Sequence, residues 1–210
     1  MMEDGNARTS ALVRQLFESG MSTYGVLDGA RNPRIHRLVG ASGKMYRPLY
    51  DGELSPGMRQ VSPYIVELDP RHAFTRSLLD QAWGNSWGVF VAAPMSLDVV
   101  RRHLRRLLRV TDERGKNLLF RFYDPRVLRV YLPTCTTSEL ETFFGPLVRF
   151  VAEDADEQVA LTFERTLTGL SVKRTPLPAP PASTAEDEAG RAAAELAAAL
   201  AELPSRSGPS

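Results

Sequence analysis

The stretch WGVFVAAPMSLDVVRRHLRRLLRV, residues 87–110, joins a short apolar run to a segment with two chemically different sides. Residues 87–92 are rich in aromatic and β-branched side chains, which is typical of a buried β-strand. Ser96 is a good helix N-cap residue, and apolar side chains recur every three or four positions after it. The stretch therefore predicts a strand followed by an amphipathic helix over 97–110.

Five arginines share one side of this predicted helix, and leucine and valine side chains occupy the opposite side. At about 100° per residue, the arginines fall within an arc of about 140°. They are Arg101, Arg102, Arg105, Arg106 and Arg109. Guanidinium groups form bidentate pairs with carboxylates or phosphates, so this row is a candidate surface for an acidic protein partner. A merely solvated face and a nucleic-acid surface are the alternatives.

Short apolar runs recur along the rest of the chain and alternate with helical patterns. Further strands are expected at 24–27, 64–68, 118–123, 148–151 and 159–163. Further helices are expected at 9–19 and 74–83. This alternation predicts an α/β domain with a mixed sheet and flanking helices.

The composition changes near the C-terminus, where prolines cluster and alanine-rich sequence follows. We expect an α/β domain over 1–168, a proline-rich linker over 169–185, a short C-terminal helix over 186–203 and a disordered tail over 204–210. Ser183 and Glu186 have the spacing of a capping box. The apolar stripe of this helix is a second candidate partner contact, made of Leu196, Leu200 and Leu203, and a fraying tail that docks nowhere is the alternative.

The overall composition is that of an ordinary globular protein. The 210 residues are 43% hydrophobic, carry a formal net charge of +1 and include one cysteine. Near-neutral charge disfavours nucleic acid or an anionic membrane as a partner. A single cysteine fits a reducing compartment, and no secretory leader or membrane span is apparent. We therefore expect a cytoplasmic protein that is not itself secreted.

The residues 84–88, Gly-Asn-Ser-Trp-Gly, match the G-x-S-x-G pattern of serine hydrolases. In those enzymes the serine follows a strand and precedes a helix, whereas here a predicted helix comes first and a strand follows. Only His103 lies downstream as a possible base, in the middle of the basic helix. Hydrolysis by Ser86 is therefore the alternative, and a tight turn between helix and strand is the preferred interpretation.

Other candidate chemistry is sparse. Asp28, Asp69 and Asp124 each follow a predicted strand, but each precedes glycine or proline, as turn-forming aspartates do. The three histidines are far apart in sequence, and Cys135 has no companion at metal-ligand spacing. We expect no catalytic residue, no metal, no cofactor and no small-molecule substrate.

Several motifs occur in a fixed order between Tyr24 and Phe163. They are YGVLDGARNPR (24–34), PYIVELD (63–69), WGNSWG (83–88), LLFRFYDPRVL (118–128), YLPTC (131–135) and FFGP (143–146). Together they resemble the adaptor-chaperone family of the type VI secretion system. The motif residues for which we expect a structural role are Asp28, Arg31, Pro33, Trp83, Gly84, Trp87, Gly88, Tyr123, Asp124, Pro125 and Arg126.

This resemblance implies a bacterial protein without catalytic residues. Such an adaptor holds a cognate toxic effector in the cytoplasm and loads it onto the valine-glycine repeat (VgrG) spike protein. The expected partners are therefore the effector and the spike, with no nucleic acid and no membrane.

Overall fold

The structure, a computed structural model, describes residues 7–111 and 114–179. The expected C-terminal helix and tail, with Leu196, Leu200 and Leu203, lie outside the described residues. Within the described part, no helix is long and apolar enough to cross a bilayer.

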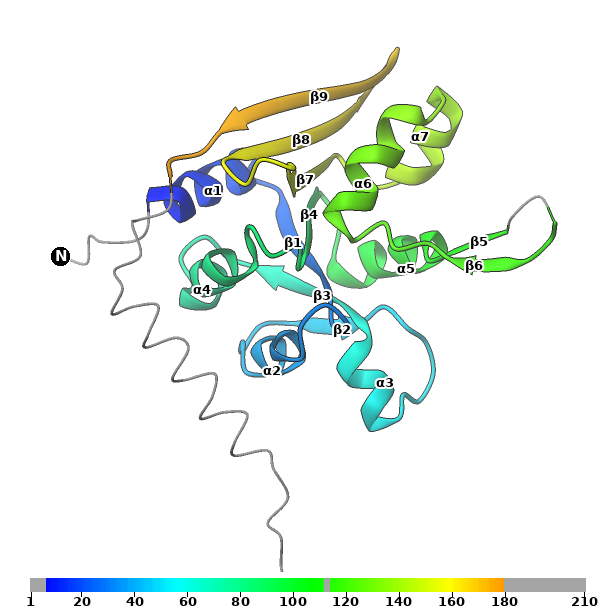
Figure 1. The fold of residues 1–210 in the computed structure, drawn as a ribbon, viewed down its shortest axis with the longest axis horizontal. Helices are drawn as coiled ribbons and strands as arrows, with labels where there is room; N and C mark the ends of the chain where they lie inside the picture. The colour runs from blue at the N-terminus through cyan, green and yellow to red at the C-terminus, as the bar shows by residue number, and fades with distance from the viewer. Residues whose placement is uncertain (1–6, 112–113, 180–210) are drawn as a thin grey trace, which may run out of the picture. The chain divides into compact units, whose positions relative to one another are not determined.

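A seven-stranded sheet forms the centre of the domain (Figure 1). In spatial order its strands are β2 (Tyr46–Pro48), β3 (Pro63–Leu68), β1 (Ser22–Asp28), β4 (Gly88–Ala93), β7 (Arg149–Glu153), β8 (Val159–Thr166) and β9 (Gly169–Pro176). The strand predictions at 24–27, 64–68, 87–92, 148–151 and 159–163 are confirmed to within a few residues.

The α/β class and the flanking helices are confirmed, but the sheet differs from the expected mixed one because all its strand pairs are antiparallel. A helix does connect β3 to β4, and these two strands run in the same direction, as in a parallel βαβ unit. However, β1 lies between them and runs the opposite way. Each neighbouring pair is therefore antiparallel although strands and helices alternate.

Helices cover both faces of the sheet. One face carries α1 (Ala7–Phe17), α2 (Arg34–Gly40) and α4 (Ala73–Ala82), and the other carries α5 (Leu97–Leu107), α6 (Pro125–Tyr131) and α7 (Thr137–Phe144). A short α3 (Pro56–Val61) has no buried residue, and a 3₁₀ turn, η1 (Leu132–Thr134), follows α6. Ser96 occupies the N-cap position of α5, as expected, but its side chain makes no capping hydrogen bond.

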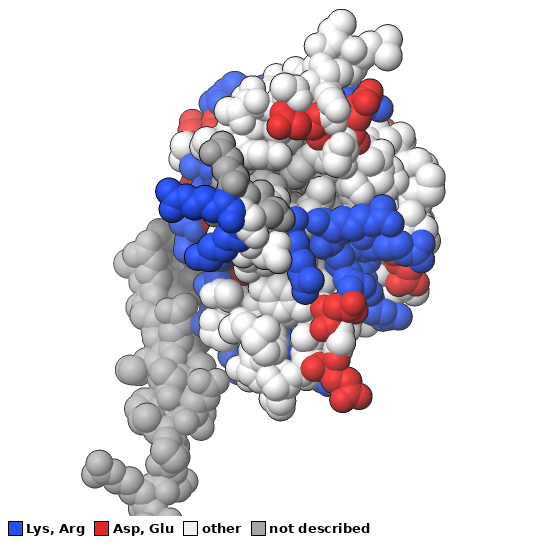
Figure 2. Space-filling view, turned by 90° about the vertical axis from the view of Figure 1, so that its right-hand side faces the viewer, with Lys and Arg blue, Asp and Glu red and all other residues white. Residues whose placement is uncertain are grey.

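A second sheet, of two strands, extends from the end of α5. Its strands are β5 (Arg109–Thr111) and β6 (Asn117–Leu119), and the hairpin lies on the side of the molecule shown in Figure 2. The prediction of a helix to residue 110 is therefore wrong by three residues, and the predicted strand 118–123 is too long. Phe122 and Tyr123 belong to no strand because a turn leads directly from Arg121 into α6.

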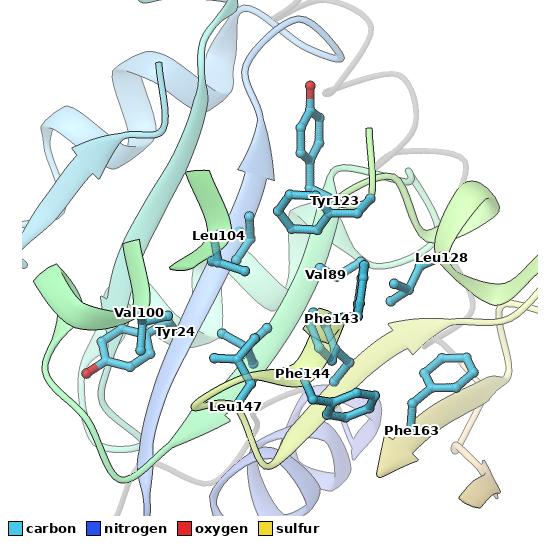
Figure 3. Packing of buried hydrophobic residues seen from close by; sticks show 14 of the residues in the cluster. Tyr24, Val89, Val100, Leu104, Tyr123, Leu128, Phe143, Phe144, Leu147 and Phe163 are labelled. Carbon is cyan, nitrogen blue, oxygen red and sulfur yellow. The ribbon is translucent and has the colours of Figure 1, made fainter. Parts of the chain in front are cut away.

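Alternation along the strands divides the buried residues into two cores. In β4, Val89 and Val91 pack with the α5–α7 side, whereas Phe90 packs with the α1–α4 side. The first core is rich in aromatic rings, and Figure 3 shows Phe143, Phe144 and Phe163 within it. The expected core positions of Trp83 and Trp87 are confirmed, since their exposed fractions are 3% and 5%.

The strand β9 corrects the predicted domain boundary, because it occupies most of the first half of the expected linker 169–185. It pairs with β8 over its whole length, from Gly169 to Pro176. Its side chains are largely exposed, which is why the segment shows no apolar period in the sequence. Leu177, directly after it, is buried in the second core.

The close approach of β4 to β1 gives a test of this packing. A Cβ added at Gly88 would lie 2.1 Å from the carbonyl oxygen of Val26, so Gly88→Ala should lower the free energy of unfolding by about 3 kcal/mol or more. At Gly57, in α3, an added Cβ meets nothing within 4 Å. Gly57→Ala should therefore stay within about 1 kcal/mol of the wild type in chemical denaturation. Equal stability of the two variants would contradict the pairing described here.

Candidate functional site

Three buried carboxylates lie at one end of the central sheet. Asp28 ends β1, Glu153 ends β7, and Asp124 is the N-cap residue of α6; their exposed fractions are 1%, 6% and 5%. Because β1 and β7 both run antiparallel to β4, their C-terminal residues lie at the same end of the sheet. We call this group, with Arg121 and Arg126, the polar end.

Asp28 is held by both backbone and side-chain partners. One carboxylate oxygen accepts a hydrogen bond from the N–H of Ala30 at 3.1 Å, and the other pairs with the guanidinium of Arg121. The hydrogen bond to Asp28 raises the pKa of Arg121 above its usual value, although burial acts in the opposite direction. Arg31, in the turn after β1, donates from Nε to the carbonyl of Asn85 at 3.1 Å and so links this turn to residues 84–88.

Asp124 combines a helix cap with an ion pair. Its carboxylate accepts from the backbone N–H of Arg126 at 2.9 Å and pairs with the Arg126 guanidinium at 2.6 Å. Burial favours the neutral acid, but these contacts to Arg126 outweigh it, so the pKa of Asp124 is lowered. The pair fixes the start of α6, where Pro125 occupies the first turn.

Glu153 holds the turn that contains Ser86. Its carboxylate accepts from the N–H of Gly84 at 2.6 Å, the N–H of Ser86 at 2.9 Å and the hydroxyl of Ser86 at 2.8 Å. Ser86 has a φ of 53°, in the left-handed region that residues other than glycine rarely adopt. The three bonds to one carboxylate explain how the turn keeps this conformation.

The surroundings of Ser86 differ from those of a hydrolase nucleophile. Its hydroxyl donates to a carboxylate, and the turn enters a strand instead of leaving one. The three histidines are engaged elsewhere: His36 bonds Tyr64, His72 caps α4, and His103 bonds the carbonyl of Phe143. This geometry favours the structural interpretation of the 84–88 motif.

The three aspartates proposed above as turn residues do not form one cluster. Asp69 accepts from the N–H of Arg71 at 2.9 Å and pairs with Lys44 at 3.0 Å, in contacts separate from those of Asp28 and Asp124. Among residues 7–111 and 114–179, no group of three His, Cys, Asp or Glu side chains could hold a metal ion. Burial raises the pKa of Cys135, which disfavours its thiolate.

The arginines of α5 and the position that follows it form a second candidate site. Figure 2 shows basic side chains gathered in a band on this face. Two of the five are engaged with the end of β2 and the segment after it: Arg101 donates from Nε to the carbonyl of Pro48 at 2.7 Å, and Arg105 pairs with Asp51. This pairing lowers the pKa of Asp51, mainly through its hydrogen bond to Arg105.

The other three arginines are free within the described structure. The side chains of Arg102, Arg106 and Arg109 are exposed and form no hydrogen bond or ion pair with any described residue. Arg102 and Arg106 are neighbours on the surface of α5, four residues apart, and Arg109 is the first residue of β5, just beyond the helix. We call these three residues the arginine row.

Two hollows flank the arginine row. The first has a volume of about 670 Å³ and is lined by Leu49, Tyr50, Asp51, Leu54, Met58, Arg102, Arg105, Arg106, Leu108, Arg109 and Leu119. The second has a volume of about 300 Å³ and is lined by Arg106, Leu107, Arg109, Val110, Phe120, Tyr131, Ser138, Glu139, Thr142 and Phe143. Arg106 and Arg109 line both hollows, and each hollow combines apolar side chains with charged ones.

Comparison with known protein families assigns most of this architecture to one family. The model of a family described as a domain of unknown function (DUF4123) matches residues 23–142, which is more than half of the chain. The chain belongs to the DUF4123 family. No curated protein and no solved structure matches it significantly.

The DUF4123 segment contains both candidate sites except for Glu153 and for Phe143 of the second hollow. It includes the motif residues of the polar end and all residues that line the first hollow. Glu153 lies outside it, and we did not predict its role from the sequence. The sequence carries only a weak signal for this role, because an acidic residue at the end of an apolar strand is common.

The polar end allows a test of the role of Ser86. Glu153→Ala removes the acceptor for two N–H groups and a hydroxyl, and should lower the free energy of unfolding by about 2–4 kcal/mol. Ser86→Ala removes one of the three bonds and should cost about 1 kcal/mol. Chemical denaturation of both variants measures this difference. A Glu153→Ala protein as stable as the wild type would refute the role assigned to this carboxylate.

Proposed function

We propose that this DUF4123 protein is a non-catalytic adaptor-chaperone of the bacterial type VI secretion system. In this role it binds a cognate toxic effector in the cytoplasm and loads it onto the valine-glycine repeat (VgrG) spike protein, without being secreted itself. The ordered motif series that resembles this family falls largely within the matched segment 23–142. The motifs supply the family assignment, and the exposed surface supplies the argument for binding.

One observation carries the proposal. The motif residues at the polar end are occupied with one another, whereas the arginine row lies exposed beside two apolar hollows. Exposed apolar surface combined with available charges is typical of a protein-binding face. Guanidinium groups pair well with carboxylates, so for a protein partner an acidic region of the effector or of the spike is the expected surface.

The nucleic-acid alternative has less support from this face. Single-stranded nucleic acid is usually bound by aromatic platforms interleaved with basic groups. Leu49, Leu54, Met58, Leu108 and Leu119 supply most of the apolar lining of the first hollow, and Tyr50 is its only aromatic lining residue. The aromatic residues that line the second hollow, Phe120, Tyr131 and Phe143, are half-buried or buried and pack against one another. A formal net charge of +1 adds little long-range attraction for phosphate.

Deletion of the gene tests the adaptor role directly. Secretion of the cognate effector should be lost, while the machine continues to deliver effectors that have their own adaptors. Complementation with the wild-type gene should restore secretion, and the purified protein should capture both the effector and the spike. Normal secretion of every effector in the deletion strain would refute the proposal.

Charge reversal tests the arginine row. Arg102→Glu with Arg106→Glu should leave the protein folded, because both side chains are exposed, but should slow association with an acidic partner by about tenfold or more at low salt. Arg76→Glu, at an exposed position of α4, is the matched control. Association of effector and spike should be measured separately by surface plasmon resonance at two salt concentrations. Unchanged rates for both would reduce the row to a solvated face.

A further inference from the structure

The first hollow has walls of different chemistry. On one side stand the side chains of α5 and Arg109, and on the other lie the segment after β2 and Met58 of α3. The exposed fractions of Met58 and Leu119 are 45% and 52%, whereas Leu108 is buried at the base. The hollow therefore presents an apolar surface beneath a basic rim.

The charges of this rim are unevenly satisfied. Arg105 is paired with Asp51 across the hollow, and this contact joins the two walls. Arg102, Arg106 and Arg109 have no acidic partner among the described residues. An occupant that supplies carboxylates would thus meet three available guanidinium groups without displacing an existing ion pair.

The surroundings also favour one conformation of the occupant. An extended peptide gains affinity by pairing with a free strand edge, but β5 and β6 are only three residues long. An amphipathic helix needs no strand edge, since it inserts apolar side chains from successive turns into a groove. A volume of about 670 Å³ accommodates several such side chains.

We propose that the first hollow binds an acidic amphipathic helix of a protein partner. Apolar side chains of that helix fill the space over Met58, Leu108 and Leu119, and its flanking carboxylates pair with the arginine row. This inference rests on the proposed function for the identity of the partner, the effector or the spike. The chemistry of the hollow is independent of that identity, so it can be tested by itself.

The probe is a fluorescein-labelled synthetic peptide of about 18 residues, or five helical turns, with leucine at positions i, i+3, i+4 and i+7, glutamate at the positions that flank this stripe and alanine elsewhere to favour the helix. Binding to the full-length protein is followed by fluorescence anisotropy. Replacing the leucines by serine, or the glutamates by lysine, should weaken binding by about tenfold or more, which corresponds to about 1.4 kcal/mol. Rising salt should weaken it as well.

Variants of the protein locate the binding site. Leu119→Ser and the double variant Arg102→Glu with Arg106→Glu should each weaken binding of the acidic peptide by about tenfold or more. Leu167→Ser and Arg76→Glu should not change it, because Leu167 lies 96% exposed between β8 and β9 and Arg76 lies on α4. Circular dichroism of all variants verifies that they remain folded.

Four results would overturn the inference. They are absence of peptide binding, equal binding by the hollow variants, displacement of the peptide by a single-stranded oligonucleotide of the same charge, and tighter peptide binding by Leu196→Ser with Leu200→Ser. The last result would identify residues 180–210 of this chain as the occupant.

Capture of the natural partners distinguishes failure of this inference from failure of the adaptor proposal. If Leu119→Ser captures effector and spike as well as the wild type does, the inference fails and the adaptor role stands. If the wild type captures neither partner but binds the peptide through the hollow, the adaptor role fails and the inference stands.

Discussion

Pairing of buried carboxylates at one end of the sheet is the constraint that joins the parts of this domain. Asp28, Asp124 and Glu153 are almost fully buried, and an unpaired charge in such a place costs several kcal/mol. Each is satisfied by a different part of the chain: Arg121, Arg126 and the 84–88 turn. The ends of β1 and β7, the entry to β4 and the start of α6 are therefore held together by charge as well as by packing.

The polar end and the candidate binding face are connected through the first core. Phe122 and Tyr123, between the two arginines of the polar end, are buried in the same cluster as Val100 and Leu104 of α5. The apolar side of α5 is thereby fixed, and its arginines are displayed on a rigid support. A preorganised surface loses less conformational entropy on binding than a mobile one, which favours affinity for a partner.

The sequence was sufficient for features that depend on local periodicity and insufficient for those that depend on long-range pairing. The two-sided pattern of 97–107 predicted α5 and its orientation correctly. Nothing local shows that β1 lies between β3 and β4, so the mixed sheet was expected wrongly. The role of Glu153 was missed for the same reason, because it depends on β7 lying beside β4. The division of the five arginines likewise depends on the loop at Pro48 and Asp51, which approaches α5 only in the folded chain.

The DUF4123 match contains the arginine row and the first hollow in full but only part of the central sheet. Residues 23–142 supply β1 to β4, but one edge of β4 is paired only when β7 is present, and Glu153 completes the turn at 84–88. The matched segment therefore depends on the strands that follow it. In contrast, all residues that line the first hollow lie within the match. Met58 and Leu119 are exposed there, and exposed positions tolerate substitution with little loss of stability. The apolar lining of the hollow can therefore change with little effect on the fold.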